Sequence, residues 1–235
     1  MTETAQTRYP VIRVRTEIDF LHEGKTLTAV HPFYGPKTAK VLRDIIRANA
    51  GQREPTAPEA ISFLDALYGG EHAISQEAMA LMYPNYFRGF TGIVRDDAND
   101  LISCLDFPEF NADGSLDRSN LLARVAKGEA GIRTVPISKI QTGYQKPTEL
   151  AKNPFVCALS GAEGAEKVAR LADRHPKKEA HVWIPEVGEL PVVRIAALGS
   201  GGYGGFYVFG DGGGLGRGGY AFGVLNSREA DAPKK

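Results

Sequence analysis

The chain has 235 residues, of which 43% are hydrophobic and 24% charged, and this composition excludes an intrinsically disordered protein. Its 28 basic and 28 acidic side chains balance to a net charge of zero, which disfavours nucleic-acid binding because such proteins usually carry a basic excess. The sequence shows no secretory signal and no apolar stretch near the roughly 20 residues that span a bilayer. We therefore expect a cytoplasmic protein without a membrane segment.

The first part of the chain combines one strand pair with three helices. Strands are predicted over residues 11–15 and 25–33, with Glu23-Gly24 in the turn between them. Apolar residues at helical spacing then predict a helix over residues 37–49. Thr56 and Glu59 have the capping-box spacing that begins a second helix, which Gly69-Gly70 ends. A third helix begins near Ser75 and stops before Pro84.

From Tyr86 onward, strands predominate, with helices between them. Strands are predicted from residue 86 to 93 and over 101–105, 132–140, 181–184, 192–198, 206–209 and 220–225. Helices are predicted over residues 116–127, 149–152, 154–159 and 162–173. Because strands and helices come in runs, we predict an α+β fold with a mixed or antiparallel sheet, several short helices packed on it and a glycine-rich C-terminal β-hairpin. We expect one domain over residues 1–226, with a soft boundary near residue 85, and a disordered tail over residues 227–235.

The glycine-rich end imitates two nucleotide-binding signatures. Residues 199–204 read Gly-Ser-Gly-Gly-Tyr-Gly and match GxGxxG, but a strand follows instead of the helix that a dinucleotide site needs. Residues 217–224 are similar to an RNA-stacking strand, yet too few residues remain to complete that fold. The segment is therefore predicted to be a β-hairpin, with Tyr203, Arg217 and Tyr220 as contact residues.

Residues 109–120 overlay a calcium-binding EF-hand loop at several positions. The final position, which should hold a bidentate glutamate, is Asn120. A turn at Asp113-Gly114 followed by a helix cap explains the same residues without a metal ion. The two cysteines, Cys104 and Cys157, sit in apolar runs without metal-ligand spacing. We predict no metal site and no cofactor.

The stretch from about residue 88 to 225 resembles a family of uncharacterised microbial proteins. The resemblance rests on four segments, at residues 89–92, 150–155, 161–167 and 219–224. It covers a little over half of the chain and implies one shared domain. It implies no activity, ligand or catalytic residue.

The leading functional hypothesis is a non-enzymatic binding or assembly protein that uses a glycine- and aromatic-rich β surface. Its predicted contact residues are Tyr203, Arg217, Tyr220, Asp211, Arg194 and His31. The partner is a protein or a small molecule, and a homo-oligomer is left open. The alternative is an enzyme whose residues converge only in the fold, with candidates His31, Asp97, Arg133, Arg194 and Asp211. Single-stranded nucleic-acid binding is a weaker alternative.

Overall fold

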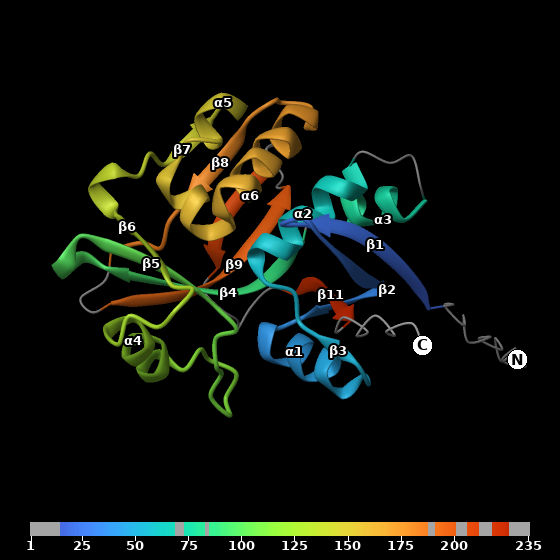
Figure 1. The fold of residues 1–235 in the computed structure, drawn as a ribbon, viewed down its shortest axis with the longest axis horizontal. Helices are drawn as coiled ribbons and strands as arrows, with labels where there is room; N and C mark the ends of the chain where they lie inside the picture. The colour runs from blue at the N-terminus through green and yellow to red at the C-terminus, as the bar shows by residue number, and fades with distance from the viewer. Residues whose placement is uncertain are drawn as a thin grey trace, which may run out of the picture.

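The computed structural model describes residues 15–68, 73–82, 85–187, 191–200, 206–211 and 218–225, except for the side chains of residues 200 and 209–211. Among these residues, strands and helices are interleaved along the whole chain (Figure 1). The strands are β1 (Thr16–His22), β2 (Lys25–Lys37), β3 (Gln52–Arg53), β4 (Tyr86–Asp96), β5 (Leu101–Asp106), β6 (Arg133–Pro136), β7 (Gly143–Gln145), β8 (Ala180–Trp183), β9 (Val192–Ser200), β10 (Phe206–Asp211) and β11 (Gly219–Leu225). The helices are α1 (Ala39–Ala48), α2 (Ala57–Tyr68), α3 (Ala73–Leu81), α4 (Arg118–Ala126), α5 (Pro147–Leu150) and α6 (Pro154–Arg174), with 3₁₀ turns η1 (Asp97–Asn99) and η2 (Ile137–Lys139).

The described strands form one mixed sheet, which confirms the predicted α+β class. Its strand order is β1-β2-β11-β4-β9-β10-β8-β7, with β3 beside β11 and with β5 and β6 extending from β4. The β11–β4 and β10–β8 pairs are parallel and the other pairs are antiparallel. Strands from both ends of the chain are therefore neighbours, since β2 and β4 flank β11.

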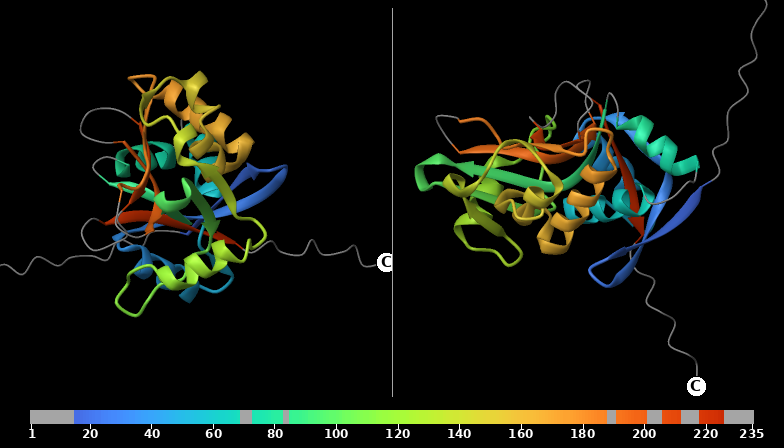
Figure 2. Two further views of the ribbon diagram at one scale, coloured as in Figure 1. Left: turned by 90° about the vertical axis from the view of Figure 1, so that its left-hand side faces the viewer. Right: turned by 90° about the horizontal axis from the view of Figure 1, so that it is seen from above.

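Helices cover both faces of this sheet and create two hydrophobic cores. The larger core joins α2 and α6 to Phe87, Ile93 and Phe222 of the sheet. The smaller core joins α1 and α4 to residues of the opposite face, including Phe90 and Ile195. In the left view of Figure 2, the strands pass between α6 above and α4 below. The larger core contains residues from before and after position 85.

Two helix boundaries follow the sequence signals closely. At the start of α2, the backbone N–H of Thr56 donates to Glu59 Oε2 at 2.8 Å, and the N–H of Glu59 donates to Thr56 Oγ1 at 3.3 Å, which confirms the capping box. Helix α6 breaks at Gly161, whose φ of 75° and ψ of 168° are not helical. The break matches the predicted division into helices over residues 154–159 and 162–173.

The first strand pair differs from its prediction at one end. The turn at Glu23-Gly24 is confirmed, with φ values of 48° and 73°. Strand β1 runs over Thr16–His22, where the inward-facing Ile18 and Phe20 alternate with the exposed Glu17, Asp19 and Leu21. The predicted strand over residues 11–15 lies outside the described residues except for Arg15, which is not in a strand.

The glycine-rich hairpin is formed by β9 and β10, which pair antiparallel from Phe206↔Ser200 to Asp211↔Ile195. Strand β11, which the sequence suggests as part of the same hairpin, lies apart from it between β2 and β4. The reason is packing, because Phe222 of β11 fills the larger core against Phe20 and Phe63. Within the described part of the chain, no helix is both long enough and apolar enough to cross a bilayer.

Candidate functional site

Aromatic side chains gather on one edge of the sheet, where β7, β8 and β10 run side by side. Tyr144 lies directly opposite His181 across the β7–β8 pair, and their rings meet edge to face at 4.6 Å between centroids. His181 stacks on Trp183, two residues along β8, at 4.3 Å. Tyr207 of β10 lies on the other side of His181, with 6.0 Å between ring centroids. We call these four side chains the aromatic face.

The aromatic face points away from the larger core. Alternate residues of a strand point to opposite sides of its sheet. Ala180 and Val182 of β8 pack into the core beneath α6, so His181 and Trp183 point the other way. Tyr144 and Trp183 are 46% and 50% exposed, which is a large fraction for rings of their size. Aromatic rings that are held in place and still half exposed are available to a ligand.

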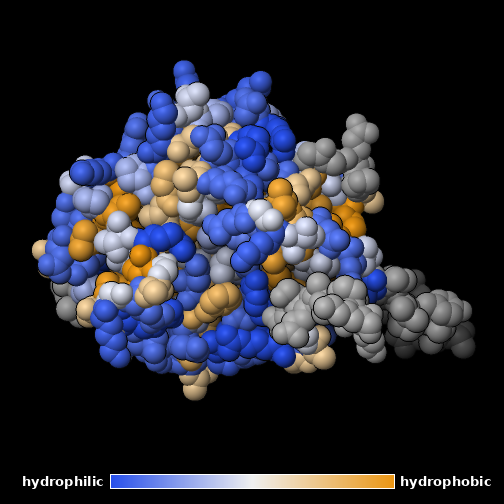
Figure 3. Space-filling view, in the orientation of Figure 1, coloured by the Kyte–Doolittle hydropathy of each residue, from blue (hydrophilic) through white to orange (hydrophobic). Residues whose placement is uncertain are grey.

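The hydropathy scale understates the apolar character of such rings. Figure 3 colours the side of the molecule seen in Figure 1 by this scale, and apolar residues form small areas there, separated by hydrophilic ones. Tyrosine, tryptophan and histidine count as moderately or strongly hydrophilic on that scale, although their ring faces bury and stack like apolar groups. The informative signal in the sequence is the alternation Ala180-His181-Val182-Trp183, which places both aromatic rings on one side of a strand. Strand β7 has only three residues and carries no periodic signal of its own.

The residues predicted to make contacts do not form one described cluster. His31 on β2 bonds Glu77 at 2.9 Å through its Nε2 atom and meets the Phe33 ring edge to face. Arg194 on β9 donates to the carbonyl oxygen of Val193 at 2.9 Å. Tyr220 on β11 is half-buried against the larger core. Tyr203, Arg217 and the side chain of Asp211 lie outside the described residues, so the contact hypothesis for this set stays a prediction.

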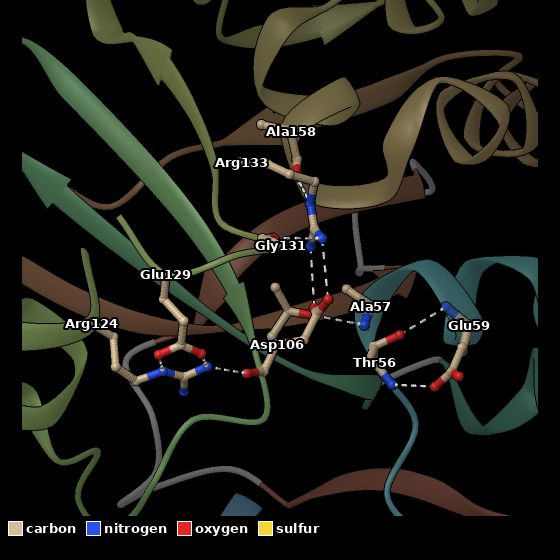
Figure 4. Close-up of polar contacts among 10 residues, drawn as sticks. Thr56, Ala57, Glu59, Asp106, Arg124, Glu129, Gly131, Arg133 and Ala158 are labelled. Carbon is tan, nitrogen blue, oxygen red and sulfur yellow. Dashed lines mark hydrogen bonds and ion pairs between the residues drawn. The ribbon is translucent and has the colours of Figure 1, made fainter. Parts of the chain in front are cut away.

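The enzyme candidates with described side chains are likewise held by separate partners. Asp97 accepts bonds from Arg95, the shortest at 2.6 Å. Arg133 donates to both carboxylate oxygens of Asp106, at 3.1 and 3.2 Å, and to the carbonyl oxygen of Ala158 at 2.6 Å (Figure 4). These contacts satisfy the charged groups and join neighbouring elements. They do not bring the candidates together.

Asp106 is the centre of a polar network that connects the sheet to α2 on one of its faces and to α4 on the other. Its Oδ1 atom accepts from the hydroxyl of Thr91 at 2.5 Å, and that hydroxyl accepts from the backbone N–H of Ala57 at 2.9 Å. Ala57 begins α2, so the network satisfies a free amide at a helix N-terminus. Arg124 of α4 donates to the carbonyl oxygen of Asp106 at 3.1 Å and forms an ion pair with Glu129 (Figure 4). The arrangement is structural, because its donors already have acceptors.

A serine–lysine contact between α2 and α6 has the same structural character. Lys167 Nζ donates to Ser62 Oγ at 2.9 Å, to the carbonyl oxygen of Leu21 at 3.3 Å and to Glu163 at 2.5 Å. His22 Nδ1 lies 2.9 Å from the same Ser62 oxygen. An ammonium group has three hydrogens, and here each has an acceptor. Lys167 therefore serves as a buried cation that joins β1, α2 and α6.

In the loop over residues 109–120, the carboxylate oxygens accept hydrogen bonds within a turn and at the start of α4. Asp113 Oδ1 accepts from the backbone N–H of Ser115 at 2.9 Å and from its hydroxyl at 2.7 Å. Asp117 caps α4 by accepting from the N–H of Asn120 at 2.9 Å. The predicted turn and helix cap are confirmed. Among the described residues, no group of three or more histidine, cysteine or acidic side chains is placed to hold a metal ion.

Cys104 behaves as the buried hydrophobic residue that its apolar run predicts. It lies fully inside the larger core on β5, and burial raises the pKa of its thiol to about 12. Cys157 on α6 is half-buried, and burial also raises the pKa of its thiol. A thiol must ionise to act as a nucleophile, so both environments disfavour reactivity.

Comparison with known proteins yields a fold but no family. No protein-family model matches the chain, and no curated protein matches it. The resemblance to an uncharacterised microbial family therefore stays a prediction. A solved structure described as "Accommodation of massive sequence variation in Nanoarchaeota by the C-type lectin fold" matches with a TM-score of 0.55 and 14% sequence identity. The match covers 91% of this chain and 99% of that chain. This chain has a C-type lectin-like fold.

The lectin-like sheet places the aromatic face at one end of its strand order. Strands β10, β8 and β7 are the last three, and β1 is at the opposite end. Phe209 of β10 is in register with Trp183 on one side and Ala197 on the other, while Asp211 is in register with Ile195. Since Ile195 belongs to the smaller core, α1 and α4 cover the same sheet face further along β9. The aromatic face therefore lies on the same side of the sheet as α1 and α4, next to the area that these helices cover.

We expect acidification to destabilise the fold through two histidines, His181 of this face and His175 at the end of α6. Burial lowers the pKa of His181, and burial together with the Lys177 charge lowers the pKa of His175. Because the folded chain favours both neutral rings, the unfolded chain binds protons first as the pH falls. The contribution of the two neutral rings to the free energy of unfolding is therefore fully present above about pH 6.5, the ordinary histidine pKa. It is lost as the pH falls through this value and below it.

Thermal unfolding from about pH 8 to about pH 5 measures this effect. The melting temperature should fall across that range in the wild type and fall less steeply in a variant carrying His175→Gln and His181→Gln. Parallel curves for the two proteins would show that these rings do not contribute.

Proposed function

We propose that this protein is a saccharide-binding protein that contacts its ligand through the aromatic face. The observation that carries the proposal is the half-exposed pair of Tyr144 and Trp183, held in place by His181 between them. The C–H faces of sugar rings stack on aromatic rings, and the polar edges of tyrosine and histidine hydrogen-bond to hydroxyl groups. The face thus offers both elements of sugar recognition.

Preorganisation supports the same proposal. Short strands with regular pairing hold Tyr144, His181 and Trp183, and cross-strand contacts orient their rings. Ordering a flexible side chain on binding costs about 0.5–1.5 kcal/mol, which rings that are already positioned avoid in part. The matched solved structure is described as accommodating massive sequence variation within this fold. A framework of that kind suits a binding protein, whose surface can differ while its sheet persists.

Binding to a panel of immobilised oligosaccharides tests the proposal. The wild type should retain at least one saccharide class, and Trp183→Ala or Tyr144→Ala should weaken that binding about tenfold or more. Leu21→Ala is the matched control, because Leu21 is 60% exposed but lies on β1, at the other end of the strand order. Self-association that both aromatic substitutions abolish, without binding to any saccharide, would assign the face to a homo-oligomer instead.

A further inference from the structure

A second surface feature lies at α5 and α6, and Lys177 connects it to the aromatic face. A groove of about 820 Å³ runs between α5, the second half of α6 and the loop that leads into β8. Its lining includes Lys146, Lys152, Lys177 and Lys178, together with Arg170. Acidic side chains in the lining are fewer, namely Glu166, Asp173 and Glu179. The lining of the groove therefore has a net positive charge, with five basic and three acidic residues.

The ion pairs within the groove leave part of this positive charge without a counterion. Arg170 bonds Asp65 at 2.7 Å, and Lys178 lies 3.9 Å from Asp173. Lys146, Lys152 and Lys177 are exposed, and each lacks an acidic partner within ion-pair distance among the described residues. Glu166 and Glu179 offset part of the charge of these three ammonium groups, and the positive charge that remains attracts anions, an attraction that weakens with added salt.

Lys177 links the groove to the aromatic face. Its Nζ atom lies 6.0 Å from the centroid of the Tyr144 ring, within the range of a cation–π contact, and its side chain also lines the groove. Lys146 follows Tyr144 by only two residues, at the start of α5. A ring bound on the aromatic face at Tyr144 would therefore place its substituents near the Lys177 ammonium group, with Lys146 two residues away along the chain.

We infer that the ligand is an acidic saccharide, with sugar rings on the aromatic face and carboxylate or sulfate groups beside Lys177 and Lys146. This inference rests on the saccharide-binding function proposed above and specifies its ligand class. Charge complementarity selects the anionic sugar over a neutral one. A single-stranded nucleic acid is the less suitable polyanion, because nucleic-acid binding usually needs a basic excess and the net charge of the chain is zero.

Two matched ligand pairs test the inference, each measured by calorimetry at low and moderate salt. One pair is an oligogalacturonate and its methyl ester, and the other is a cello-oligosaccharide with and without sulfate groups. The acidic member of at least one pair should bind about tenfold more tightly than its neutral counterpart, and added salt should narrow the difference. A variant with Lys146→Gln and Lys177→Gln should lose this preference, so that the acidic and the neutral sugar bind with similar affinity. Lys127→Gln, on the exposed end of α4, is the matched control and should change neither affinity.

The outcomes separate the inference from the function on which it rests. Equal affinity for acidic and neutral sugars would overturn the inference and leave the saccharide function intact. Binding of no saccharide, in these pairs or on the oligosaccharide panel, with or without binding of a single-stranded oligonucleotide, would overturn both. A preference for the acidic sugar that persists in the double lysine variant would overturn the assignment to this groove. Circular dichroism and the melting temperature of the lysine variant confirm that it is folded.

Discussion

Replacement of Gly89 by alanine should be among the most destabilising single substitutions in this protein. Gly89 lies in β4 where α2 begins, and an added Cβ atom would lie 2.3 Å from the Cα of Ala57 and 2.7 Å from its nitrogen. Both are backbone atoms, so no side chain can rotate away to relieve the clash. We expect a loss of about 3 kcal/mol in the free energy of unfolding, or about 6–12 °C in melting temperature.

Gly92→Ala is the matched control, because Gly92 lies three residues further along the same strand. There an added Cβ atom would meet the side-chain atoms Leu121 Cδ2 at 3.1 Å and Pro108 Cβ at 3.3 Å. A small shift of Leu121 relieves the closer of these contacts, so the loss should be clearly smaller than for Gly89→Ala. Denaturant unfolding measures both variants. Equal stability of Gly89→Ala and the wild type would mean that α2 does not approach β4 as described.

Replacement of Thr91 by valine should cost about 2 kcal/mol of stability, although the two side chains have nearly the same shape. Thr91 is fully buried, and its hydroxyl both accepts from the N–H of Ala57 and donates to Asp106. Valine would leave that amide buried without an acceptor, and an unpaired buried polar group costs about 1–3 kcal/mol. Urea unfolding measures the change in free energy.

Thr91→Ser provides the control for this effect, since serine keeps the hydroxyl and loses only a methyl group. It should retain most of the stability, and valine should be the more harmful of the two. If serine were as destabilising as valine, the methyl group and not the hydrogen bonds would account for the role of Thr91.

The local signals in the sequence predict much of this fold because they depend on near neighbours. The capping box at Thr56 and Glu59 needs only one helical turn, and the break at Gly161 needs only a glycine with a positive φ angle. Likewise, the turn at Glu23-Gly24 determines how β1 pairs with β2. In each case the residues that decide the structure are a few positions apart.

The position of β11 could not be predicted in the same way. Its place between β2 and β4 depends on contacts of Phe222 with Phe20 and Phe63, which are far away in the sequence. The aromatic face is equally non-local, because Tyr144 precedes Trp183 by 39 positions and comes from a three-residue strand. The sequence does predict an aromatic β surface as the contact region. It places that surface at Tyr203, Arg217 and Tyr220, and the contact role of those residues stays untested.

The fluorescence of Trp183 tests the central claim most directly, because it is the one tryptophan in the 235-residue chain. Titration with a saccharide that the protein retains should change the emission in a saturable way, since the sugar would cover a ring that is half exposed. The same titration of Tyr144→Ala should give a weaker and shallower change. Saccharide binding that calorimetry detects while the Trp183 emission stays constant would place the ligand elsewhere and contradict the aromatic face as the binding surface.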